Sequence, residues 1–314
     1  MPFPSVRPVL TVLYLVAGVI AVTASPSSAQ ESGLSFLRIG TDAAALARGD
    51  AGVASTDNAF ATYWNPAALA AGPGHSLAIS NHLWIADVRT YALAGSYRPG
   101  LKWGVGAFVT ATGSGDLEAR DRPGEPTGVF NAQFIATGVG AARDLGPLRA
   151  GVVLKFLSER IFTDSAEGYA FDFGLHADLA DGAIRLGAAW QNLGSMEDLS
   201  AQATELPELL RLGAEIFPFR IIADLDGTPL LTASIVTEYS RDMVGDESRL
   251  HVGLSSEVLE TLVVRAGYLT NDELRDFSAG MGLTISSLQF DYTLLPFESG
   301  FGGPAHILTL SYAW

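Results

Sequence analysis

Apolar and polar residues alternate over many stretches of this chain, with a period of two residues. Between 169 and 176 every second residue is Tyr, Phe or Leu, and Ala, Asp, Gly and His lie between them. The stretch 288–294 follows the same rule. Because successive side chains of a β-strand point to opposite faces, this pattern predicts strands with one apolar face and one small or polar face.

Segments of this kind begin at residue 75, and turn residues separate about fourteen of them. An even number of antiparallel strands is typical of closed bacterial barrels. The pattern therefore predicts an all-β transmembrane fold, an outer-membrane β-barrel of about fourteen antiparallel strands. We place the strands near 75–84, 90–98, 102–112, 129–144, 148–162, 168–181, 183–193, 209–218, 230–241, 248–258, 261–270, 275–285, 288–296 and 305–314.

The predicted connections alternate in length, as short periplasmic turns and longer outer loops do in such barrels. The stretch 219–229 is an exception, because a tight turn is expected there. It indicates either a periplasmic excursion or a slip in the strand count. The short links lie at 99–100, 145–147, 181–182, 259–260 and 286–287, and the longer ones at 113–128, 194–207, 242–247 and 297–304.

The last residues form a strand that ends on an aromatic side chain. Leu308, Leu310, Tyr312 and Trp314 occupy every second position. Taken alone, this segment also suits the last strand of a soluble β-sandwich, but the upstream pattern favours a barrel. We expect Leu310, Tyr312 and Trp314 to act as the assembly signal for the barrel assembly machinery.

The N-terminal residues read as a secretory signal peptide over 1–29. Arg7 precedes an apolar run from 9 to 22, and Ser27 and Ala29 stand where cleavage before Gln30 requires small residues. The run is shorter than the roughly 20 residues that a spanning helix needs. We expect the mature protein in the outer membrane of a Gram-negative-type bacterium, in contact with outer-membrane lipid.

Residues 30–74 are rich in Ala and Gly and form a predicted hatch, a segment that plugs the barrel of residues 75–314. It contains one short helix-compatible run, 41–48, which Thr41 or Asp42 could cap. Gly49 and Gly52 are interpreted as turn and close-packing glycines.

Composition narrows the function. The chain has 48% hydrophobic residues, no cysteine and a net charge of −15, so it lacks the basic footprint of a nucleic-acid-binding protein and any thiolate metal site. Its five His residues have no metal-ligand spacing, and there is no nucleophile elbow of the form Gly-x-Ser-x-Gly. We predict no enzyme, no cofactor and no metal site.

Charged and polar residues on the less apolar face of the strands are expected to line the lumen. Facing lipid at the midplane would cost an Arg or Lys about 2 to 4 kcal/mol. Packing and pairing across the interior is the favoured interpretation, and ligand contact is the alternative. The candidates are Asp172, His176, Arg185, Arg211, Glu215, Arg249, His251, Arg265 and Asp291.

The most specific local motif is Tyr63-Trp64-Asn65-Pro66-Ala67, which follows the run Arg48 to Ala54. Pro66 holds Asn65 away from the α region, and an Asn side chain can bond the backbone two residues on, so Asn65-Pro66 starts a rigid turn. We interpret the motif as a structural turn of the hatch. Direct ligand contact by Asn65 or Trp64 is the alternative.

This order of elements resembles the PorV/PorQ family, whose members are similar to FadL, the long-chain fatty acid transporter with a fourteen-stranded barrel and a hatch bearing Asn-Pro-Ala. The chain departs from the family at two points: Leu46-Ala47-Arg48-Gly49 stands where many members read Leu-Gly-Met-Gly, and Ala68 replaces a frequent Gly.

The PorV/PorQ resemblance implies an interaction or shuttle component linked to type IX protein secretion and surface attachment. Its partners would be secreted proteins with C-terminal signal domains. The loops 113–128 and 194–207 are small for gripping a folded domain.

The alternative is FadL-like passive transport of long-chain fatty acids or other hydrophobic small molecules. That function implies an apolar pocket near the outer mouth, a mobile hatch and a kink in the wall. Glycine pairs such as Gly138 with Gly140, or Gly280 with Gly282, could host the kink, although such glycines more often allow close packing. A fully plugged structural barrel is the third possibility.

Overall fold

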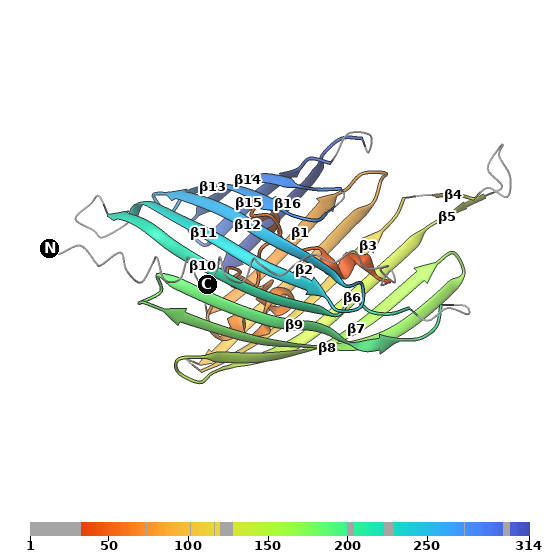
Figure 1. Cartoon of the computed structure of the whole chain (residues 1–314), viewed down its shortest axis with the longest axis horizontal. Coiled ribbons are helices and arrows are strands. Elements are labelled where there is room, and N and C mark those ends of the chain that lie inside the picture. The colour runs from red at the N-terminus through yellow and green to blue at the C-terminus, as the bar shows by residue number, and fades with distance from the viewer. Residues whose placement is uncertain are drawn as a thin grey trace.

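A closed antiparallel barrel of fourteen strands encloses the N-terminal hatch (Figure 1). The computed structural model describes residues 33–72, 74–100, 102–115, 117–119, 128–199, 204–222, 229–272, 274–297 and 302–314. The predicted signal peptide, 1–29, lies outside the described residues. Among the described residues, no helix is long and apolar enough to cross a membrane.

The wall runs in chain order from β1 to β16 and closes where these two strands pair, from Ser76 opposite Ala313 to Leu83 opposite His306. The strands of the wall are β1 (His75–Leu83), β2 (Arg89–Gly100), β3 (Trp103–Gly113), β6 (Ala132–Asp144), β7 (Arg149–Ile161), β8 (Asp164–Leu179), β9 (Ile184–Met196), β10 (Leu209–Ile222), β11 (Pro229–Asp242), β12 (Glu247–Val258), β13 (Leu262–Leu269), β14 (Phe277–Ile285), β15 (Leu288–Leu295) and β16 (Ala305–Ala313).

The predicted fold class and strand number are confirmed, but two local expectations were wrong, and one of the two alternatives for 219–229 is excluded. The predicted strand 129–144 is broken at Asn131: β5 (Gly128–Phe130) pairs with β4 (Leu117–Ala119) in a separate two-stranded sheet. The link between β7 and β8 has two residues, because β8 begins four residues earlier than the predicted strand. The strand count does not slip at 219–229, because β10 continues to Ile222 through a register shift between Ile216 and Phe219.

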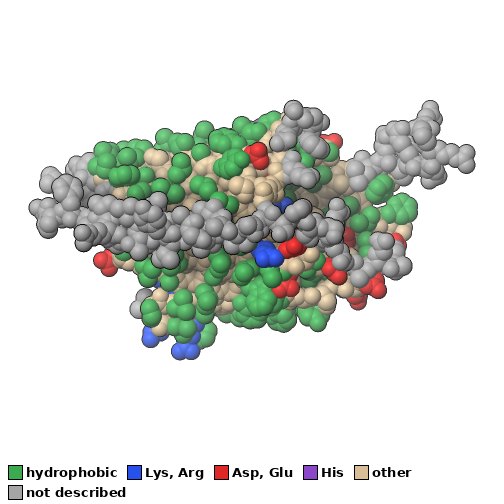
Figure 2. Space-filling model, in the orientation of Figure 1, with side chains coloured by type: hydrophobic (Ala, Val, Ile, Leu, Met, Phe, Trp, Pro, Cys, Tyr) green, Lys and Arg blue, Asp and Glu red, His purple; other side chains and the backbone are tan. Residues whose placement is uncertain are grey.

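The two faces of the wall differ as the alternation predicted. Phe171 and Phe173 are exposed on the outside, while Asp172 between them is fully buried inside. Figure 2 shows hydrophobic side chains spread over the outer surface of the wall. An apolar outer band of this kind is the surface that a barrel presents to lipid.

The terminal strand places its aromatic residues on the outer face. Tyr312 and Trp314 are exposed and stacked, with ring centroids 5.2 Å apart. The backbone of Trp314 exchanges hydrogen bonds of 3.0 and 3.1 Å with His75, so the last residue helps to close the barrel. The role of this strand as an assembly signal stays a prediction.

We expect deletion of Trp314 to lower the amount of folded barrel recovered from membranes, because it removes both hydrogen bonds to His75 and the terminal aromatic ring. Trp190→Ala removes an exposed aromatic ring from β9 and leaves the closing pair intact, and serves as the control. Unchanged levels of the deletion variant would contradict the expectation.

The described part of the hatch, residues 33–72, consists of four short helical turns inside the barrel. They are η1 (Ser35–Arg38), α2 (Ala43–Leu46), α3 (Ala61–Trp64) and η2 (Pro66–Ala70). The predicted helix over 41–48 is therefore shorter, and its cap is Asp42, whose carboxylate accepts a hydrogen bond of 2.9 Å from the Ala45 amide.

The hatch backbone lies directly against the backbone of the wall. At a set of wall glycines, a Cβ atom would meet hatch atoms at less than van der Waals distance. On Gly174 it would overlap Oδ1 of Asn65, and on Gly267 it would overlap the backbone nitrogen of Gly49. Glycine is required where two backbones approach so closely. The set, hereafter the glycine ring, comprises Gly104, Gly106, Gly151, Gly174, Gly187, Gly213, Gly253, Gly267 and Gly280.

We expect Gly174→Ala to destabilise the folded barrel by about 1 to 3 kcal/mol, because the added methyl group forces Asn65 off its site. The temperature at which the folded band disappears in semi-native electrophoresis measures this. Gly100→Ala is the matched control, because nothing lies within 4 Å of a Cβ there. Equal temperatures for the two variants would contradict close seating of the hatch.

Candidate functional site

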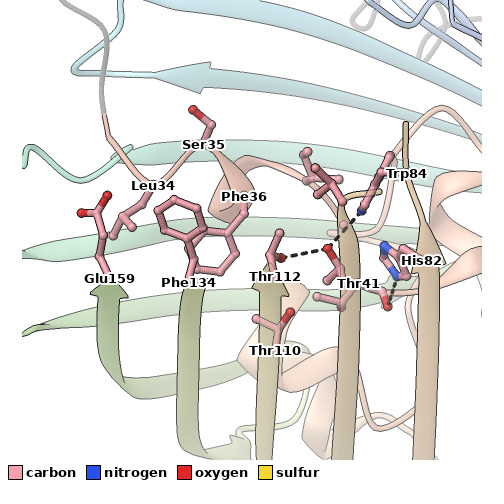
Figure 3. Close-up of a pocket in the computed structure, with 14 residues that line it drawn as sticks. Leu34, Ser35, Phe36, Thr41, His82, Trp84, Thr110, Thr112, Phe134 and Glu159 are labelled. Carbon is pink, nitrogen blue, oxygen red and sulfur yellow. Dashed lines mark hydrogen bonds between the residues drawn. The ribbon is translucent and has the colours of Figure 1, made fainter. Parts of the chain in front are cut away.

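An apolar pocket of about 330 Å³ lies between the hatch and the wall, at the end of the barrel where β1, β3 and β7 finish (Figure 3). The start of β1 and the end of β16 are paired at the opposite end of the barrel. We call the end that carries the pocket the loop end. The hatch contributes one side and five strands contribute the other. The lining residues are Leu34, Ser35, Phe36, Ile39, Gly40, Thr41, His82, Trp84, Val88, Thr90, Thr110, Thr112, Phe134 and Glu159.

Aromatic rings form much of the pocket. Phe36 of the hatch packs against Phe134 of β6 with ring centroids 5.8 Å apart. Trp84 donates a hydrogen bond of 3.0 Å to the hydroxyl of Thr90, which shares a hydrogen bond of 2.8 Å with Thr112. These polar groups satisfy one another and leave apolar surface towards the cavity.

The size of the pocket suits a small apolar molecule. Ligand sites are typically concave, mostly apolar cavities of about 300 to 1,000 Å³ with a few polar groups. An apolar cavity of about 150 Å³ is enough to hold benzene. The pocket at 330 Å³ is therefore large enough for two fused aromatic rings.

Polar atoms without protein partners occur at one side of the pocket. Oγ1 of Thr41 and Nδ1 of His82 are buried and have no hydrogen-bond partner. The other ring nitrogen of His82 lies 3.1 Å from the Thr41 carbonyl oxygen and 3.1 Å from Oγ of Ser80. Buried polar atoms of this kind are normally satisfied by water or by a ligand.

Among the described residues that line the pocket, Glu159 is the only one with a carboxylate. It lies on β7 and is 6% exposed. Its Oε2 accepts a long hydrogen bond of 3.4 Å from the Thr204 hydroxyl. In Figure 3 the carboxylate lies beside Leu34, across Phe36 and Phe134 from Thr41 and His82. Sequence analysis missed Glu159, although it follows the inward parity of Lys155 and Leu157 on the same strand.

A second cavity, of about 230 Å³, lies against the hatch towards the other end of the barrel and is polar. Arg48 lies 3.3 Å from Glu215, and Arg185 lies 3.4 Å from the same carboxylate. Ser255 contributes a buried hydroxyl with no partner. Hatch residues border both cavities, since Thr41 lines the apolar pocket and Asp42 lines the polar one.

The candidate lumen residues all lie on the inner side of the wall, and none of them lines the apolar pocket. Asp172 pairs with Lys155 at 2.6 Å, Arg211 with Glu238 at 2.8 Å, and Arg265 with Asp291 at 2.6 Å. The remaining candidates hold similar inward positions. His176 contacts Arg149 at 3.1 Å, His251 contacts the Gly49 carbonyl oxygen at 2.7 Å, and Arg249 pairs with Glu247 at 3.0 Å.

Glu238 is the wall residue that holds the hatch most directly. Its Oε2 accepts hydrogen bonds of 2.9 Å from the backbone amides of Gly52 and Val53, and its Oε1 pairs with Arg211. The guanidinium of Arg211 lies 5.0 Å from the ring centre of Trp64. Sequence analysis did not single out Glu238. The available signal was its position on the inward-facing side of β11, at which every second residue is buried.

The motif from Tyr63 to Ala67 lies in the centre of the hatch and does not line the apolar pocket. Asn65 donates hydrogen bonds of 2.8 and 2.9 Å to the carbonyl oxygens of Val53 and Leu175, and accepts one of 3.1 Å from the Ala67 amide. Asn65 therefore ties two hatch segments to β8. This arrangement favours the structural interpretation over direct ligand contact.

At the end of the barrel that carries the apolar pocket, the last part of β9 has no partner on β10 among the described residues. Their ladder stops at Gln191 and Leu209, although β9 continues to Met196 against β8. The register between β8 and β9 shifts between Phe171 and Phe173, and Asn192 has a φ of 65° at this bulge. A cavity of about 430 Å³ lies beside the unpaired stretch and is lined by Met196, Thr204, Leu206 and their neighbours. We call this stretch the β9–β10 seam.

The glycine pairs considered as possible kinks do not interrupt the wall. The strands that carry Gly138, Gly140, Gly280 and Gly282 pair with both neighbours without a register shift at these positions. Gly138 instead makes room for the ring of Phe108. The possible kink is therefore absent at these positions, and close packing, the use favoured by the sequence analysis, is observed at Gly138.

Comparisons with known proteins agree with this fold. No family model matches the chain, and no curated protein matches it. Among solved structures, the Ralstonia pickettii toluene transporter TbuX aligns at 14% identity over 87% of this chain and 97% of its own, with a TM-score of 0.58. The CymD monoaromatic hydrocarbon channel aligns at 14% identity over 90% and 98%, with a TM-score of 0.61.

A Pseudomonas aeruginosa FadL homologue aligns at 12% identity over 86% of this chain and 97% of its own, with a TM-score of 0.52. At such identities the likeness establishes the fold alone. The chain thus has the fold of FadL-like outer-membrane barrels. None of these comparisons supports a PorV/PorQ assignment or a link to type IX secretion.

Within the described part of the chain, no group of three or more His, Cys, Asp or Glu side chains is arranged to hold a metal ion. The features that define the candidate site are the apolar pocket, the hatch packed against it and the β9–β10 seam.

We expect Asn65→Ala to leave the barrel folded but to lower its unfolding temperature, because three buried hydrogen bonds of about 1 kcal/mol each are lost. Asn65→Asp is the comparison variant: it keeps the acceptor for Ala67, loses the two donor bonds and turns a buried carboxylate oxygen toward the carbonyl oxygens of Val53 and Leu175. Semi-native electrophoresis should rank the two variants below the native protein. Complete loss of the folded band in Asn65→Ala would instead show that the motif is needed for folding.

Proposed function

We propose that this protein is an outer-membrane channel for the passive uptake of apolar small molecules. The observation that carries the proposal is the 330 Å³ apolar pocket at the loop end of the barrel. Two of the similar structures are titled as a toluene transporter and a monoaromatic hydrocarbon channel. The proposal corresponds to the FadL-like alternative of the sequence analysis. The secretion shuttle, in contrast, has no supporting feature among the described residues.

The pocket supplies the driving force for capture. Transfer of an apolar molecule from water into an apolar environment is favourable by roughly 25 cal/mol for each Å² that leaves water. The faces of Phe36, Phe134 and Trp84 offer such an environment. A lumen lined only by polar side chains would not provide this favourable transfer free energy.

The hatch restricts the route beyond the pocket. Its backbone lies against the glycine ring around much of the wall, and Glu238 and Asn65 hold it by hydrogen bonds. A straight path along the barrel axis would have to break these contacts. We therefore favour a fixed hatch over a mobile one.

The β9–β10 seam provides a route through the wall instead. Thr204 lines the seam cavity, and its hydroxyl donates to Glu159, which lines the apolar pocket. Leu34, which lines the apolar pocket, and Leu206, which lines the seam cavity, belong to the same cluster of packed apolar residues. A ligand that displaced Thr204 would pass from the pocket to the seam without entering the polar cavity.

Filling the pocket should block uptake. Thr110 is buried and lines the pocket from β3, so we expect Thr110→Trp to reduce the uptake of radiolabelled toluene by cells that produce the protein, by about fivefold or more. Ala111→Trp places the same side chain on the outer face of the same strand, where aromatic residues are at home near the rim of a barrel. This control should take up toluene like the native protein.

Both variants should be present in the membrane in equal, folded amounts. Uptake by Thr110→Trp at the native level would contradict a transport role for the pocket. Uptake in all strains equal to that of cells without the protein would contradict the channel itself.

A further inference from the structure

The apolar pocket contains one acidic side chain and no basic one. Among its fourteen lining residues, Glu159 is the only Asp or Glu, and there is no Lys or Arg. A pocket built to hold the carboxylate of a fatty acid would need a positive charge or several donors near that group. The lining offers no positive charge, and its unpartnered polar atoms, on Thr41 and His82, lie across Phe36 and Phe134 from Glu159, so an anionic ligand has no charged partner in the pocket.

Nearby positive side chains do not compensate for Glu159. Lys155 precedes Glu159 by four residues on β7 and points inward like it. Its ammonium group lies 2.6 Å from Asp172 and 2.7 Å from Oδ1 of Asn192. Arg160 follows Glu159 in the chain and is exposed, on the opposite face of β7. Among the described residues, Glu159 thus has one hydrogen-bond partner, the Thr204 hydroxyl at 3.4 Å.

A carboxylate in this position needs hydrogen-bond donors. An ionised carboxylate can accept about four hydrogen bonds, and Glu159 accepts one from the described residues, so it can accept more from a ligand in the cavity that it lines. In Figure 3 it lies beside Leu34, and the rings of Phe36 and Phe134 come next along the pocket. A flat molecule packed on these rings would place a polar substituent within reach of it.

We propose that the pocket selects uncharged aromatic molecules that carry a hydrogen-bond donor, such as phenol-type compounds, and rejects aromatic carboxylates. The ring system packs against Phe36 and Phe134, and its hydroxyl group donates to Glu159. This inference rests on the proposed function and names the class of ligand that the same pocket takes.

The test uses the purified full-length protein in detergent at near-neutral pH, with 2-naphthol, naphthalene and 2-naphthoate as ligands. Equilibrium dialysis with fluorescence detection gives each affinity. We expect 2-naphthol to bind roughly tenfold more tightly than 2-naphthoate and about fivefold more tightly than naphthalene. The fused rings match the size of the pocket.

The decisive variant is Glu159→Gln, which keeps the shape of the side chain and removes its charge. We expect it to raise the affinity for 2-naphthoate about tenfold and so to narrow the gap between the two ligands. Glu167→Gln removes an exposed acidic charge from the neighbouring strand β8 and should change neither affinity.

The outcomes separate this inference from the proposed function. If 2-naphthoate binds the native protein as tightly as 2-naphthol, or if Glu159→Gln leaves the ratio unchanged, the selectivity is overturned and the channel proposal stands. Equal binding of naphthalene and 2-naphthol would overturn the role of the donor. If none of the three ligands binds, the proposed function fails, and the inference fails with it.

Discussion

The close approach of the hatch backbone to the wall backbone is the constraint on which the rest of the structure depends. A segment packed inside a closed wall must find a partner for each of its buried amides and carbonyl groups. The glycine ring gives the backbone room, and inward side chains supply the partners: Glu238 accepts from Gly52 and Val53, Ser278 from Gly49 and Thr309 from Ala43. Small and polar residues on the inner face of the strands are therefore a requirement of the hatch as much as of the lumen.

A hatch held in this way separates two cavities with different chemistry. The apolar pocket lies towards the loop end, and the cavity with Arg48, Arg185 and Glu215 lies towards the other end. An apolar molecule gains from entering the first cavity, but it would have to displace water from charged groups to enter the second. The β9–β10 seam lies beside the first cavity, so the proposed route, which opens when Thr204 is displaced from Glu159, avoids the second.

The alternation of the sequence was enough to predict the wall, because burial of every second residue follows from strand geometry alone. Phe171, Asp172 and Phe173 illustrate this. The alternation could not reveal the seam. The bulge at Asn192 depends on pairing with β8 and on the Asp172 carboxylate, which accepts a hydrogen bond from the Asn192 amide. The transport alternative implied an apolar pocket near the outer mouth, but its lining residues escaped prediction, because hatch residues near Phe36 meet strands far away in the chain, such as the one carrying Phe134. The motif around Asn65 was found correctly as a turn, yet its partners Val53 and Leu175 became visible only in three dimensions.

The most direct test of the account is a crystal structure of the native protein soaked with 6-bromo-2-naphthol, in which anomalous scattering locates the bromine. The account predicts one strong peak in the pocket between the hatch and β1, β2, β3, β6 and β7, with the ring system against Phe36 and Phe134 and the hatch unmoved. A peak confined to the polar cavity, or a hatch displaced from the glycine ring with the bromine in its place, would contradict it.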